Sequence, residues 1–264
     1  MRIPKTSRRP SAPLVEIALG RGDYAAGGAH SLPFLDLDGA RHRRPLIFGE
    51  ITDDLSGYPE VAAEMFAGRQ DDPGEWAVMW KEIGADGVLI DLHDQSADLV
   101  KEVSERTRLP VAVVADDGVL EETSHVDGTR LILIGRGHDY HGPCGNHVVS
   151  VTAKSVDIGA SSLPEPGRCV LRIEGFSMDS MRADTSVAEG IRARGLSGET
   201  GMGHPIMADV RGCWGSGFRD AREASMWEAE SALAAMLAGA DIVIVRGPGA
   251  ADMARVYGEE LADL

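Results

Sequence analysis

Residues 224–248 read ASMWEAESALAAMLAGADIVIVRGP, and this stretch carries the clearest signal of the fold class. Its first half repeats apolar residues at a helical period, which predicts a helix packed on a sheet. The apolar side carries Met226, Ala229, Leu233, Met236, Leu237 and Ala240, and the opposite side Trp227, Glu228, Ser231, Ala235 and Ala238. Gly239 is a typical helix stop, and the apolar run 242–245 predicts a strand buried on both faces, as in a parallel sheet. This strand ends at Arg246, on the sheet edge where α/β folds bind ligands.

The same unit recurs along the chain. Eight strand-like runs occupy residues 46–50, 88–92, 111–116, 131–136, 148–154, 170–174, 206–211 and 242–246. Helical patterns occupy 75–83, 96–106, 186–196, 222–237 and 250–261. Eight alternations favour a closed TIM (β/α)8 barrel over an open sheet. Glycines and prolines in 139–146 and 157–167 predict that the fourth and fifth crossover helices are reduced to loops.

The N-terminal region lies outside this repeat. Residues 14–19 and 31–37 are short extended stretches on either side of a glycine-rich segment, which predicts a hairpin that plugs one end of the barrel. We therefore expect an N-terminal tail and β-hairpin cap over 1–40 and a TIM barrel over 41–264.

Composition excludes several classes of partner. The 264 residues include 26 basic and 42 acidic side chains, a net charge of −16 that repels nucleic acid and anionic membranes. The chain has neither an apolar run of about 18 residues nor the core of a signal peptide, so we expect a cytoplasmic protein without a membrane segment. Cys144, Cys169 and Cys213 are widely spaced, which argues against a disulfide framework and against an iron–sulfur cluster in this chain.

Charged residues cluster at the predicted strand ends, on the barrel face that holds active sites. They are Glu50, Asp91, Asp116, Arg136, Lys154, Glu174, Asp209, Arg211 and Arg246. Such a ring suits a polar ligand, although its members could equally pair with one another. Beyond the sixth strand, Phe176, Met178 and Met181 could form an apolar rim for a large flat ligand or a partner, or pack as an ordinary loop.

Two further patterns carry weaker hypotheses. His138, His141, Cys144 and His147 recur every three residues, a regular spacing that suggests metal ligands, but it matches no usual zinc motif and solvated loop histidines are the simpler interpretation. Lys154 could form a Schiff base inside a barrel, as in aldolases, although an ion-paired lysine is the commoner case. The motifs name no catalytic residue and no metal site.

Collinear motifs then point to a family. They are LPF at 32–34, DDPGEWA at 71–77, GADGVLIDL at 84–92, NHVV at 146–149, SVAEGIR at 186–192, HPIMADV at 204–210, WEAESALAAMLAGAD at 227–241 and VRGPGA at 245–250. The sequence resembles the delta subunit of the acetyl-CoA decarbonylase/synthase complex, the small subunit of the corrinoid iron–sulfur protein, as a short, diverged member.

The resemblance implies a TIM barrel in a heterodimer of the Wood–Ljungdahl pathway. A larger subunit with an iron–sulfur cluster and a cobalamin domain would hold a corrinoid against this barrel's mouth, and methyl groups would pass from a tetrahydropterin through cobalamin to acetyl-CoA synthase. A pterin methyltransferase and acetyl-CoA synthase would be further partners. The residues expected at the corrinoid are Glu50, Asp91, Asp116, Arg136, Glu174, Phe176, Met178, Met181, Asp209 and Arg246. The alternative is a stand-alone tetrahydropterin-binding methyltransferase of the pteroate-synthase-like barrel type.

Overall fold

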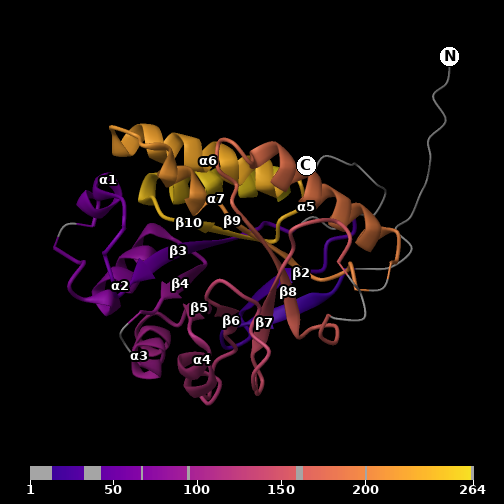
Figure 1. The fold of residues 1–264 in the computed structure, drawn as a ribbon, viewed down its shortest axis with the longest axis horizontal. Coiled ribbons are helices and arrows are strands. Elements are labelled where there is room, and N and C mark those ends of the chain that lie inside the picture. Colours follow the sequence, from indigo (N-terminus) through magenta and orange to yellow (C-terminus); the bar gives the residue numbers. More distant parts are fainter. Residues whose placement is uncertain are drawn as a thin grey trace.

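The predicted barrel is confirmed. We describe the chain from a computed structural model, which places residues 14–32, 43–66, 68–93, 96–158, 163–199 and 201–262. Eight parallel strands close into a barrel in the order β10-β3-β4-β5-β6-β7-β8-β9 (Figure 1). These strands are β3 (Leu46–Thr52), β4 (Gly87–Asp91), β5 (Val111–Ala115), β6 (Ile132–Gly135), β7 (Val148–Thr152), β8 (Cys169–Glu174), β9 (Ile206–Asp209) and β10 (Ile242–Val245).

Alternate residues of each strand face the barrel interior and the surrounding helices. In β10, Ile242 and Ile244 belong to the apolar cluster inside the barrel, whereas Val243 and Val245 belong to the larger cluster beneath the helices. All four side chains are fully buried. Burial on both faces explains why the strands appear in the sequence as unbroken apolar runs.

All five predicted helices are present, with bounds shifted by a few residues. They are α2 (Pro73–Ile83), α3 (Ala97–Thr107), α5 (Met181–Leu196), α6 (Ala221–Leu237) and α7 (Pro248–Ala262). Three short elements were not predicted: α1 (Glu60–Glu64), α4 (Asp117–Thr123) and the 3₁₀ helix η2 (Arg211–Ser216). Each is too short for a helical period to show in the sequence. No described helix has the length and apolarity that crossing a bilayer would require.

The reduced crossovers are also confirmed. The loop from β6 to β7 contains no helix, and neither do the described residues between β7 and β8. Side chains hold the first of these loops in place instead. The Tyr140 hydroxyl donates to the main-chain oxygen of Pro143 at 2.9 Å, and the carboxylate of Asp139 accepts the N–H of Thr152 at 2.8 Å.

The N-terminal hairpin closes one end of the barrel, as predicted, and the structure shows that this is the amino-terminal end. The prediction placed the second strand of the hairpin wrongly. β1 (Glu16–Leu19) pairs antiparallel with β2 (Tyr24–Gly27), inside the glycine-rich segment. Of the predicted second strand, residues 31 and 32 are not strand and 33–37 lie outside the described residues. Ile17, Leu19 and Ala26 join the apolar cluster of the barrel interior, so the hairpin fills that end with side chains.

The predicted apolar face of α6 is correct at Ala229 and Met236 and wrong at Met226. Met226 is 53% exposed, whereas Glu228 and Ser231 are fully buried. The complete buried set is Ala224, Ser225, Glu228, Ala229, Ser231, Ala232, Ala235 and Met236. Figure 1 shows α6 packed beside α7, and small residues permit this close contact. The hydropathy pattern predicted the wrong face for Glu228 and Ser231 because both have hydrogen-bond partners, which permit polar side chains to be buried.

Candidate functional site at the barrel mouth

The alternation of inward-facing and outward-facing side chains continues to the carboxyl-terminal end of the strands. There the inward positions are polar in every strand, and together they form the mouth of the barrel. These inward residues are Glu50, Asp91, Asp116, Arg136, Thr152, Glu174, Asp209 and Arg246, with Ser150, Arg172 and Arg211 beside them.

Glu50 is the centre of this ring. Its side chain is 2% exposed and lies between the guanidinium groups of Arg211 and Arg246, with a 3.0 Å contact from Nη2 of Arg246 to Oε1. Burial alone would raise the pKa of Glu50, but the two arginines outweigh burial and lower it below the usual value. Glu50 is therefore a buried, ionised carboxylate that accepts hydrogen bonds and does not act as an acid.

Asp209 and Arg211 form a bidentate pair. Nε of Arg211 lies 2.8 Å from Oδ1 of Asp209, and Nη2 lies 2.6 Å from Oδ2. Burial acts to raise the pKa of Asp209, and Arg211 more than reverses that effect, so the pKa is lowered. Arg211 thereby bridges Asp209 and Glu50, and its Nη1 is also 4.0 Å from Asp91.

A second, more exposed group occupies the β4–β6 side of the mouth. Arg136 approaches Asp91 at 2.8 Å and Asp116 at 3.6 Å, and His93 lies 3.4 Å from Asp91. The side chain of Asp116 is 81% exposed. Among the described acidic side chains that face the barrel axis, Asp116 is therefore the most exposed to solvent.

The β7–β8 side contains residues that sequence reasoning missed. Arg172 is 5% exposed, contacts Glu174 at 2.7 Å and donates to the Thr152 hydroxyl at 3.3 Å. Its Nε and the buried hydroxyl of Ser150 have no hydrogen-bond partner. The signal was present in VLRIE, because a two-residue period puts Arg172 on the same face as Glu174.

Arg246 is held by an aromatic ring and, through its main chain, by a carboxylate of helix α6. Its guanidinium lies 4.5 Å from the centre of the Tyr58 ring, a cation–π contact. The N–H groups of Arg246 and Gly247 each donate at 2.7 Å to the carboxylate of Glu228. Burial raises the pKa of Glu228 to about 7. Helix α6 therefore positions the end of β10 through a buried carboxyl group.

Of the predicted apolar rim, one residue is exposed. Met178 is 43% exposed in the loop after β8. Phe176 is fully buried in the main core, where its carbonyl accepts from the Cys213 thiol, and this corrects its expected place over the mouth. Met181 is the first residue of α5 and not part of the loop.

The two weaker hypotheses find no support in the arrangement. His138 contacts Asp117 at 2.9 Å, whereas His147 is buried and accepts the N–H of Leu131, so the histidine-rich loop does not converge. Among the described residues, no group of three or more potential ligands is close enough to hold a metal ion. Lys154 is exposed beyond the end of β7 and does not enter the barrel.

Comparison with known proteins gives similarity of fold. No protein-family model and no curated protein matches the sequence. Dihydropteroate synthase from Burkholderia cenocepacia, in complex with 7,8-dihydropteroate, superposes with a TM-score of 0.59 at 14% identity, covering 96% of this chain and 99% of that one. The Thermus thermophilus enzyme gives 0.59 at 16% identity, covering 93% and 99%. The Xanthomonas albilineans enzyme, also with 7,8-dihydropteroate, gives 0.57 at 14%, covering 84% and 95%.

At identities of 14–16%, the comparisons show a shared fold only, and the chemistry depends on the residues of the site. The resemblance to the delta subunit rests on sequence motifs and stays a prediction. The chain has the TIM-barrel fold of the dihydropteroate synthases over nearly its whole length.

Proposed function

We propose that this protein is a pterin-binding barrel of the pteroate-synthase type that acts on a tetrahydropterin methyl donor at the carboxyl-terminal mouth. The observation that carries the proposal is the pair of buried, unpartnered groups in the barrel interior, Nε of Arg172 and the hydroxyl of Ser150. Buried polar groups are normally satisfied, so an unsatisfied pair on the inward face of β7 and β8 is where a ligand's polar atoms would bind.

The chemistry of the ring suits a pterin. A pterin presents N–H donors beside a carbonyl oxygen along one edge, so it needs a carboxylate acceptor and a cationic or hydroxyl donor. Asp91 and Asp116 supply the carboxylates on one side of the mouth, and Arg172 and Ser150 supply the donors on the other. Glu50 is already saturated by two arginines and would set the charge of the site without binding the ligand.

Calorimetric titration of the whole chain with methyltetrahydrofolate tests the proposal. We expect saturable binding that weakens about tenfold in Ser150→Ala, the effect of one lost hydrogen bond of about 1.4 kcal/mol. The unfolding free energy of Ser150→Ala should be unchanged or higher, because the removed hydroxyl has no partner in the free protein.

A matched pair of acids provides the control. Asp116→Asn should weaken binding, whereas Asp117→Asn should not, because Asp117 is the first residue of α4 and contacts His138. Absence of saturable binding, or an equal effect of both changes, would count against a pterin at this mouth.

A second candidate is a subunit that caps a corrinoid held by a partner. The favouring observation is Met178, an exposed apolar side chain beside the mouth. Of the other two apolar residues expected there, Phe176 is buried and Met181 begins α5, so the described residues offer a corrinoid macrocycle little apolar surface. Recovery of the tagged chain from its native cell discriminates the candidates: a co-purifying cobalamin-domain protein with corrinoid absorbance would support the second one.

A further inference from the structure

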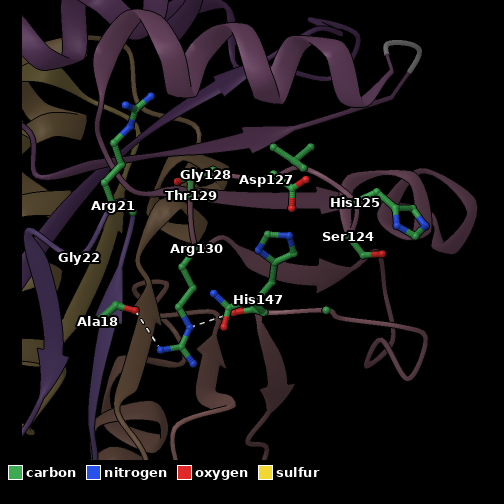
Figure 2. Close-up of a pocket in the computed structure, with 14 residues that line it drawn as sticks. Ala18, Arg21, Gly22, Ser124, His125, Asp127, Gly128, Thr129, Arg130 and His147 are labelled. Carbon is green, nitrogen blue, oxygen red and sulfur yellow. Dashed lines mark hydrogen bonds between the residues drawn. The ribbon is translucent and has the colours of Figure 1, made fainter.

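An open cavity of about 670 Å³ lies at the other end of the barrel, which we name the amino-terminal cavity. It is bounded by the turn of the β1–β2 hairpin and by the loops that precede β6 and β7 (Figure 2). Its polar lining includes Arg21, Ser124, Asp127, Thr129, Arg130 and His147. None of these residues takes part in the mouth.

The charge of this cavity is unusual because its half-buried arginine, Arg130, has no carboxylate partner among the described residues. Arg130 donates to the main-chain oxygens of Asn146 at 3.1 Å and Ala18 at 3.2 Å, drawn as dashed lines in Figure 2, and also to that of Gly167. Carbonyl oxygens satisfy the N–H groups but leave the positive charge uncompensated. Burial, and then the nearby charge of Arg168, lower the pKa of Arg130.

Apart from Arg130 and Arg168, the half-buried and buried arginines among the described residues pair with carboxylates, such as Arg44 with Asp86 and Arg192 with Asp241. Within the described residues, Arg130 and the nearby Arg168, which lies outside the cavity lining, make no such pair, and neither does the exposed Arg21. A half-buried cation without a carboxylate partner, such as Arg130, is unexpected in a protein of net charge −16. Excess positive charge in a concave surface attracts anions.

The other side chains of the cavity define the kind of anion. The buried hydroxyl of Thr129, next to Arg130, has no partner and is a potential donor. His147 adds no charge, because Nδ1 accepts the N–H of Leu131 and burial lowers the pKa of the ring. Asp127 is the acid among the described lining residues, and it would repel an anion.

We propose that the amino-terminal cavity is a second ligand site, separate from the mouth, that binds a small polyvalent oxyanion of phosphate or polycarboxylate chemistry. Arg130 and Arg21 supply the charge and Thr129 a hydroxyl donor. The volume is sufficient for a ligand of metabolite size. This inference is independent of what the mouth binds.

Calorimetric titration of the full chain with pyrophosphate and, separately, with citrate tests the site at constant ionic strength. We expect saturable binding of at least one probe. Arg21→Gln should weaken binding about tenfold and Asp127→Asn should strengthen it several-fold, through the loss of one attractive or one repulsive charge. Both residues are exposed at the surface, so the variants should fold.

Arg222→Gln is the matched control. It removes the same charge from an exposed residue of α6, near the carboxyl-terminal end of the barrel, and should leave binding unchanged. Stronger binding of pyrophosphate would assign a phosphate ligand, and stronger binding of citrate a polycarboxylate. The proposal is overturned if neither probe binds saturably, or if Arg222→Gln weakens binding as much as Arg21→Gln, which would reveal a general effect of net charge.

Discussion

At the scale of the residue, Glu50 shows how charge holds the mouth together. Replacement by Gln leaves Arg246 buried without its carboxylate and deprives Arg211 of one of its three carboxylate neighbours. Removing one carboxylate of a buried charge cluster leaves the positive charges of its partners buried without compensation. We therefore expect the unfolding free energy to fall by about 3 kcal/mol. Urea denaturation measures this change. Glu199→Gln, which removes an exposed partner of Arg194, should have little effect, and equal losses in both variants would contradict the argument.

Glu228 predicts a dependence of stability on pH. Its pKa is about 7 in the folded protein, against a usual value of 4.5, so the folded state binds more protons between these values. Stability should therefore fall as pH rises from about 4.5 to 7 and then level off, by about 3 kcal/mol in total for this group. Denaturation of the protein and of Glu228→Gln at pH 5 and pH 8 isolates the effect.

The Glu228→Gln variant is compared with the unmodified protein because other groups titrate over the same pH range. His147 and His204 have pKa values lowered by burial and contribute with the opposite sign, but they do so in both proteins. Glu50 and Asp209 have lowered pKa values and lose their contribution only in more acidic solution. Identical slopes in the two proteins would show that Glu228 is ionised throughout.

At the scale of the element, β10 and α6 meet at Gly247. A Cβ there would lie 2.9 Å from Oγ of Ser225 and 3.0 Å from both Oε2 of Glu228 and the Trp214 ring. Gly247→Ala should therefore cost about 1–3 kcal/mol by overpacking. Gly249→Ala is the control, because its Cβ would be 3.6 Å from the nearest atom and alanine favours helix α7. Thermal unfolding of both variants gives the difference, and similar midpoints would refute the packing argument.

The N-terminal hairpin offers a second test at this scale. Ile17 is fully buried among the side chains of the barrel interior. If the hairpin folds together with the barrel, Ile17→Ala should lower the unfolding free energy by about 2–4 kcal/mol without changing the dependence on denaturant. Glu16→Ala, on the exposed face of β1, should be nearly neutral. A biphasic transition would show instead that the hairpin unfolds separately.

At the scale of the whole molecule, net charge opposes folding. The chain carries −16, and repulsion among the surplus carboxylates favours the expanded state. Added salt shortens the screening length from about 30 Å at 0.01 M to about 8 Å at 0.15 M. We therefore expect the urea midpoint to rise over this range of sodium chloride. A fall would mean that attractive surface pairs outweigh the general repulsion.

The sequence predicted the barrel because its signal is local and repeated. An unbroken apolar run such as 242–245 identifies a strand buried on both faces, and the charge that follows it marks the mouth. The ring itself was foreseen at Glu50, Asp91, Asp209 and Arg246 for the same reason, since parallel strands end at one edge.

What the tertiary structure decided depends on contacts between distant residues. The burial of Glu228 and Ser231 and the exposure of Met226 follow from where α7 and the end of β10 meet α6, and no helical period records that. The unpaired state of Arg130 and of the Nε of Arg172 likewise follows from which partners the fold brings near. The architecture can be predicted from the sequence, because apolar strand runs and helical periods are patterns among residues close together in the chain. Only the fold decided which charges are neutralised, because that depends on distances across the barrel.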